Sequence, residues 1–246
     1  MRILLIFFLV YLAGQLVKKV RAQRQHRKLV RQLKDLGVYG GTIRVKTVGK
    51  QPQVHQTLSR KPDGPIPFGY KTAWLALKCQ DPRQVAAALN YQHIECANWE
   101  TGLSRSMEPG GAVFFSPVLD GFILVIGYEL FALADRQDEL EALAAQFAQV
   151  QYFADYRVSS TYCWARYEAG YCVRAYRIGD GQVLWNTGSL TSEEQALGFS
   201  AFPIPDAKDA VRWPDEEDVL NIAAAWGIDP RFERKMYPPS VGWICD

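Results

Sequence analysis

The chain has 246 residues, of which 48% are apolar and 13% aromatic, which excludes a disordered protein and allows a sizeable core. Nine of its 28 Lys and Arg residues, but none of its 26 acids, lie in residues 1–34, so the remainder carries a net charge of −7. That negative body disfavours nucleic-acid binding and suits a basic protein partner, although an acidic surface also serves solubility.

The first predicted element is an amino-terminal apolar helix. Residues 3–17 are apolar except for Gln15. If Lys18 and Lys19 reach the headgroups, the length of the helix approaches the minimum needed to cross a bilayer. A cleaved signal peptide is the main alternative, but eight basic residues follow in 18–34 and no small-x-small cleavage site is present. The positive-inside rule predicts a spanning or interfacial anchor in a bacterial inner membrane, with the body in the cytoplasm. The residues expected to contact the membrane are Phe7, Phe8, Tyr11, Lys18, Lys19, Arg21, Arg24, Arg27 and Lys28.

A break in composition separates this helix from the body. Glycines stop the basic helix after residue 36, residues 42–48 alternate like one strand, and residues 49–67 are polar with four prolines. The expected division is therefore an anchor and basic helix in 1–36, a short strand and linker in 37–67, an α+β domain in 68–230 and a tail in 231–246.

The body opens with alternating strands and a helix. Residues 72–78 predict a strand, Asp81 and Pro82 begin a helix, and residues 92–99 and 112–116 predict two more strands. The next stretch, 121–156, is expected to form the middle of the core.

Within that stretch, Phe122 to Ile126 form an unbroken apolar run, which is typical of a strand buried on both faces. Asp135 is expected to cap a helix with an apolar face, and residues 150–156 return to a strand. In residues 85–99 and 143–156 alike, a helix end runs into an aromatic-ended strand. We interpret this as a weak internal repeat of two βαβ-like halves.

The last third predicts a strand meander followed by two helices. Residues 161–167, 171–178 and 183–185 predict strands joined by glycine-containing turns. Thr191 and Glu194 form a capping box for a short helix, and Asp215 caps a final helix that ends at Gly227. The fold class is therefore α+β, with a mostly antiparallel sheet and packed helices.

The sequence offers little catalytic chemistry. His93 stands alone in a predicted strand, no nucleophile motif occurs, and no His, Cys and carboxylate cluster has metal-ligand spacing. We therefore predict no catalytic residues, no metal and no cofactor. The five cysteines lack a Cys-x-x-Cys pair and favour a reducing compartment, although Cys163 and Cys172 could face each other across a hairpin.

Two segments are candidates for partner binding. Trp99 and Glu100 lead into a polar loop ending at Gly111, which fits an interaction hot spot, a ligand wall or simply a core tryptophan. Four consecutive acids begin the last helix, where they either attract a cation or complement the helix dipole. The candidate partner-binding residues are Trp99, Glu100, Asp215, Glu216, Glu217 and Asp218.

Three motifs carry a resemblance to a known family. They are Tyr70 to Trp74 (YKTAW), Ala97 to Glu100 (ANWE) and Pro214 to Leu220 (PDEEDVL). Over residues 68–230 the chain resembles a family of uncharacterised bacterial α+β proteins, some members of which are immunity proteins that neutralise toxins.

The resemblance and the acidic body together predict a non-enzymatic, membrane-tethered protein that neutralises a toxin by protein–protein contact. One alternative is a small-ligand sensor or enzyme with its site near Trp99 and Glu100. Another is an envelope scaffold that the amino-terminal helix targets to the membrane.

Overall fold

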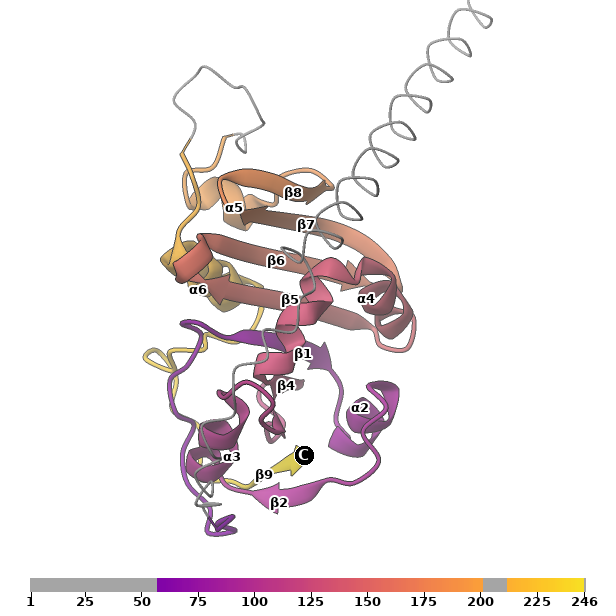
Figure 1. Ribbon diagram of the computed structural model, residues 1–246, viewed down its shortest axis with the longest axis vertical. Coiled ribbons are helices and arrows are strands. Elements are labelled where there is room, and N and C mark those ends of the chain that lie inside the picture. Colours follow the sequence, from indigo (N-terminus) through magenta and orange to yellow (C-terminus); the bar gives the residue numbers. More distant parts are fainter. Residues whose placement is uncertain (1–56, 201–211, 246) are drawn as a thin grey trace, which may run out of the picture. The chain divides into compact units, whose positions relative to one another are not determined.

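The computed structural model describes residues 57–200 and 212–245. They form a nine-stranded antiparallel sheet in the order β2-β9-β3-β4-β1-β5-β6-β7-β8 (Figure 1). The expected α+β class is therefore confirmed. The predicted membrane anchor, the strand at 42–48 and most of the linker lie outside the described residues. In the part of the chain that is described, no helix combines the length and apolar character that a bilayer span requires.

The elements follow in chain order. They are β1 (Ala73–Lys78), α2 (Pro82–Ala88), β2 (Glu95–Ala97), α3 (Trp99–Ser106), β3 (Val113–Phe115), β4 (Phe122–Ile126), the 3-10 helix η1 (Tyr128–Asp135), α4 (Gln137–Ala144), β5 (Gln149–Tyr156), the 3-10 turn η2 (Arg157–Ser159), β6 (Thr161–Glu168), β7 (Tyr171–Gly179), β8 (Gln182–Thr187), α5 (Ser192–Ala196), α6 (Glu216–Trp226) and β9 (Gly242–Cys245).

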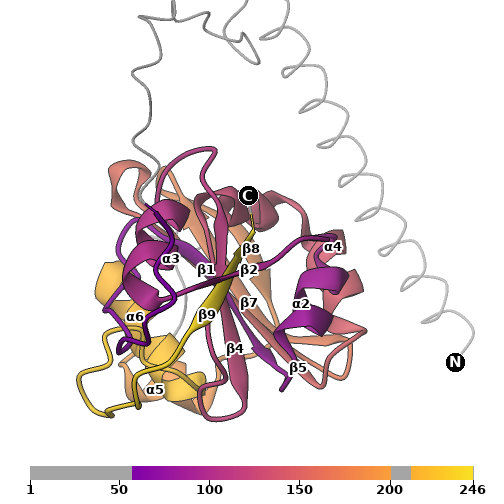
Figure 2. The same ribbon diagram turned by 90° about the horizontal axis from the view of Figure 1, so that it is seen from below.

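Helices cover both faces of the sheet. Figure 2 shows α2 and α4 on one side and α3, α5 and α6 on the other. Two apolar clusters follow from this arrangement, one under α2, η1 and α4, and the other under α3 and α6. Because side chains alternate across a strand, β4 sends Ile123 and Val125 into the first cluster and Leu124 and Ile126 into the second. The prediction of a strand buried on both faces is confirmed.

The strand–helix–strand units do not join neighbouring strands. β1 pairs antiparallel with both β4 and β5, so β4 and β5 run parallel on either side of it. β2 and β3 likewise run parallel on either side of β9. In the predicted repeat, three strands lie between β1 and β2, whereas one strand lies between β4 and β5. The two expected halves therefore differ in topology.

Local signals placed most helix starts correctly. Asp81 caps α2, the capping box of Thr191 and Glu194 begins α5, and Asp215 begins α6 in the same way. Asp135 is the exception: it ends η1 and its carboxylate binds Arg177 at 2.6 Å, while α4 begins at Gln137 without a side-chain cap.

The predicted tail is part of the sheet. β9 lies between β2 and β3, and its Ile244 pairs with Glu95 and Phe114. A Cβ atom on Gly242 would lie 2.4 Å from the carbonyl oxygen of Phe115, so only glycine allows this close approach. The compact unit runs from residue 56 to residue 246, which extends the predicted domain at both ends.

All five cysteines are free thiols. Cys163 lies opposite Arg177 in the β6–β7 ladder, and Cys172 lies opposite Tyr167. The two cysteines are therefore not cross-strand partners, and the bridge that their spacing permits does not form.

Candidate functional site

The four acids predicted to bind a partner lie at the start of α6 and divide into two groups. Asp218 is 1% exposed, accepts a hydrogen bond from the backbone N–H of Asp215 at 2.9 Å, and pairs with Arg212 at 2.7 Å. Its carboxylate therefore binds groups of the protein itself and does not face a partner. Asp215 and Glu217 are exposed and Glu216 is half-buried, so these three can contribute charge to the surface.

Trp99 and Glu100 also differ from each other. Trp99 is fully buried and packs edge-on against Phe114 and Phe232, so its indole has no surface with which to contact a partner. Glu100 is exposed. The expected loop after Trp99 is helix α3, whose cap Asn98 accepts a hydrogen bond from the N–H of Thr101 at 3.1 Å. An asparagine at the cap position followed by an acid in the first turn was the signal for this helix.

Exposed apolar side chains gather around the start of α6. Tyr70, Val158 and Trp213 are 45%, 72% and 50% exposed, and a cluster of exposed apolar side chains can mark an interaction site. The Tyr70 hydroxyl donates to Glu217 at 2.5 Å, and Trp213 precedes the cap Asp215 by two residues. We call the following set the α6-start surface: Tyr70, Val158, Trp213, Asp215, Glu216 and Glu217.

The sheet brings these distant segments together. β1 and β5 are antiparallel and pair Ala73 with Ala154, so the chain before β1 lies beside the chain after β5. That geometry places Tyr70 near the η2 turn, which contains Val158. The neighbouring Arg157 pairs with Glu216 of α6 at 3.8 Å, which links the turn to the helix.

A buried carboxyl group lies next to the α6-start surface. Asp155, near the end of β5, has no exposed area, and its Oδ2 accepts a hydrogen bond of 3.4 Å from the N–H of Lys71. Burial, with a smaller contribution from the negative charge of Glu216, raises the pKa of Asp155 to about 6. No sequence pattern points to this group, because Asp155 occupies an ordinary strand position and its burial depends on distant elements.

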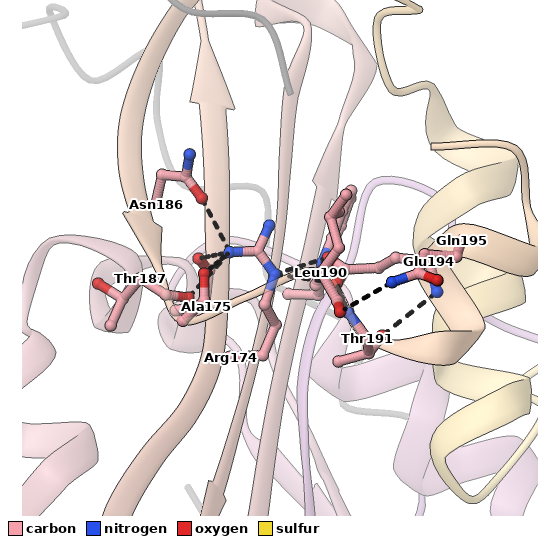
Figure 3. A network of polar contacts seen from close by, with 10 residues as sticks. Arg174, Ala175, Asn186, Thr187, Leu190, Thr191, Glu194 and Gln195 are labelled. Atoms are coloured by element: carbon pink, nitrogen blue, oxygen red, sulfur yellow. Dashed lines mark hydrogen bonds and ion pairs between the residues drawn. The ribbon is translucent and has the colours of Figure 1, made fainter. Parts of the chain in front are cut away.

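A second polar cluster is centred on two buried charged side chains. Figure 3 shows Arg174 of β7 between β8 and Glu194 of α5. Its Nε donates to Glu194 at 2.8 and 2.9 Å, and its Nη1 donates to Asn186 at 2.8 Å. Trp164 also donates to Glu194, at 2.7 Å. Because Arg174 and Glu194 are buried, this cluster attaches α5 to the sheet and is not a binding surface.

An open groove of about 820 Å³ lies between α2 and the segment that leads into β2. Its polar lining includes Arg83, His93 and Glu95, but no residue from Trp99 to Gly111. The ligand pocket expected around Trp99 is therefore not at this groove. Within residues 57–200 and 212–245, no group of three or more His, Cys, Asp or Glu side chains is arranged to hold a metal ion.

No protein-family model, curated protein or solved structure matches the chain. The family resemblance and the toxin-immunity role that it implies therefore stay predictions from the sequence motifs.

Proposed function

We propose that this is a non-enzymatic binding protein that neutralises a basic bacterial toxin through the α6-start surface. The amino-terminal apolar segment would hold it at the cytoplasmic side of the inner membrane. This part of the proposal comes from the sequence alone, because residues 1–56 lie outside the described part of the chain.

The main support is the combination of exposed aromatic side chains with carboxylates at one place. Tyrosine and tryptophan dominate the binding energy of many interfaces, since they bury a large area with little loss of conformational freedom. Tyr70 and Trp213 are about half exposed and lie among Asp215, Glu216 and Glu217. The surrounding negative charge favours a partner with a basic surface and steers its approach.

The charge of the whole body supports the same kind of partner. The residues after position 34 carry 26 acids against 19 basic residues. A nuclease or a pore-forming toxin with a basic active surface would be attracted to such a body, and covering that surface would block its activity.

The experiment expresses the product of the neighbouring gene with and without this protein and measures cell survival and complex formation. We expect the wild-type protein to restore survival. Trp213→Ala should weaken the complex by about tenfold or more, because truncating a central aromatic side chain typically costs about 2 kcal/mol.

Asp138→Asn provides the control, since Asp138 is an exposed acid on α4, on the opposite face of the sheet. It should leave survival and affinity unchanged. Unchanged toxicity in the presence of the wild-type protein, or equal effects of the two substitutions, would refute the proposal.

A further inference from the structure

Two carboxylate oxygens beside the α6-start surface are buried without a hydrogen-bond donor. They are Oδ1 of Asp155 and Oε2 of Glu216, and neither has a partner among the described residues. Buried carboxylate oxygens normally accept hydrogen bonds, because removing them from water is costly. Their remaining contacts are long: 3.4 Å from Lys71 N–H to Asp155, and 3.8 Å between Arg157 and Glu216. The two oxygens therefore lack the donors that would compensate for their burial.

The charges around this pair are mostly negative. Glu216 and Glu217 raise the pKa of Asp155, while Arg157 lowers it. The phenol of Tyr162, which lies opposite Asp155 across the β5–β6 ladder, has its pKa raised by burial and by the charges of Asp155, Glu216 and Asp215. The groups that act on Asp155 are the backbone N–H of Lys71 before β1, Arg157 in η2, and Glu216 and Glu217 at α6, and Tyr162 of β6 lies opposite it. The cation already there, Arg157, lies 3.8 Å from Glu216, and the two buried oxygens still have no hydrogen-bond donor among the described residues.

We infer that the oxygens of Asp155 and Glu216 form the receiving site for one lysine or arginine side chain of a protein partner. This inference rests on the proposed function, because it assigns the chemistry of the partner residue that docks at the α6-start surface. A guanidinium or ammonium group supplies several donors and a positive charge, which suit two carboxylates on facing elements.

Arg157 and Glu216 provide the route to the pair. The side chain of Arg157 is 56% exposed and that of Glu216 is 28% exposed, so both reach the surface, and the charges of both act on the buried Asp155. The Arg157–Glu216 pair is long, at 3.8 Å, and Arg157 is mostly exposed, so the pair contributes little stability. The incoming side chain can therefore displace Arg157 at small cost and take its place against the carboxylates.

Occupation of this site is coupled to proton release. A cation beside Asp155 favours its ionised form, so the partner binds the deprotonated carboxyl and a proton leaves to solvent. Affinity should then rise with pH. With the free carboxyl titrating near pH 6, binding should be about tenfold tighter at about pH 7.5 than at about pH 5.

The test uses a capped Gly-Arg-Gly peptide as probe and a capped Gly-Gln-Gly peptide as its neutral control. The full-length protein, with ¹³C-labelled Asp and Glu side chains, is titrated with each peptide in detergent micelles. We expect the arginine peptide to lower the titration midpoint of Asp155 and to show the tenfold pH effect, and the glutamine peptide to do neither. In Asp155→Asn, the affinity for the arginine peptide, monitored through the Glu216 signal, should no longer depend on pH. Asp138→Asn should behave as wild type.

Three results would overturn the inference. They are an unmoved Asp155 midpoint while the peptide binds, a pH dependence that persists in Asp155→Asn, and equal shifts with potassium chloride alone, which would assign the site to a free cation. If these occur while Trp213→Ala still abolishes neutralisation, the α6-start surface stands and only the receiving site is wrong. If the Asp155 midpoint moves as expected but the protein protects no cell, the proposed function fails while the cation site stands.

Discussion

Asp155 near the end of β5 has a carboxyl group that is fully buried, where ionisation loses hydration that one long hydrogen bond from Lys71 does not replace. Its pKa is raised from 3.8 to about 6. The folded state therefore holds the proton more tightly than the unfolded chain does. The stability that this group contributes is fully present below about pH 4 and is lost as the pH rises through about 6.

Asp155→Asn should remove this pH dependence, since the amide is neutral at every pH and keeps an acceptor for Lys71. We expect its free energy of unfolding to exceed that of wild type by up to about 3 kcal/mol at about pH 7.5, and the two to converge at about pH 4. Urea denaturation at both pH values measures this. Asp138→Asn, on an exposed acid, should stay within about 0.5 kcal/mol of wild type. A wild-type pH profile in Asp155→Asn would contradict the assignment.

At the scale of elements, α5 shows how a short helix depends on one internal contact. It has five residues, too few to be stable alone, and begins with a capping box in which Glu194 takes part. The same carboxylate binds Arg174 and Trp164 inside the fold. Glu194 thus both starts the helix and fixes it to β6 and β7.

Glu194→Ala should destabilise the protein by about 3–5 kcal/mol, because it removes the carboxylate that pairs with the buried Arg174 at 2.8 Å. The adjacent Glu193→Ala removes a more exposed carboxylate, 3.9 Å from Arg166, and should cost about 1 kcal/mol or less. Chemical denaturation of both variants, with amide exchange at α5, distinguishes them. Equal losses of stability would show that the internal pair does not hold α5.

At the scale of the whole molecule, the domain boundary depends on contacts made before β1. Asp63 accepts hydrogen bonds from the backbone N–H groups of Trp99 at 2.7 Å and Glu100 at 2.9 Å. It also forms a bridge with Ser240, close to β9. The end of the predicted linker therefore holds the start of α3 and the approach to the last strand.

A chain that begins at Gln56 should consequently unfold at the same temperature as the full-length body. One that begins at Phe68 should be less stable by about 2 kcal/mol or more, since a helix cap alone is worth about 1 kcal/mol and further contacts are lost with it. Thermal denaturation of the two chains tests this. Asp63→Ala in the longer chain isolates the contribution of the two hydrogen bonds that Asp63 accepts at the start of α3. Identical melting temperatures would restore the boundary at residue 68.

The elements with local signals are predictable from the amino-acid order. These signals depend on residues only a few positions apart, so they can be recognised without knowing the fold. They are the apolar run of β4, the caps at Asp81 and Asp215, and the capping box of Thr191. The acids at the start of α6 were likewise predicted as candidate site residues. The sequence pattern did not show which of them face inward.

Sequence patterns do not predict the strand order, the inclusion of β9 or the burial of Trp99 and Asp155, which are seen in the folded domain. Each of these depends on residues far apart in the chain: Lys71 and Asp155 are 84 positions apart, and Tyr70 and Glu217 are 147 apart. Periodicity predicts that a strand has a face to bury, but not which distant element will cover it. The candidate site exists because the sheet brings the start of β1, the end of β5 and the start of α6 together.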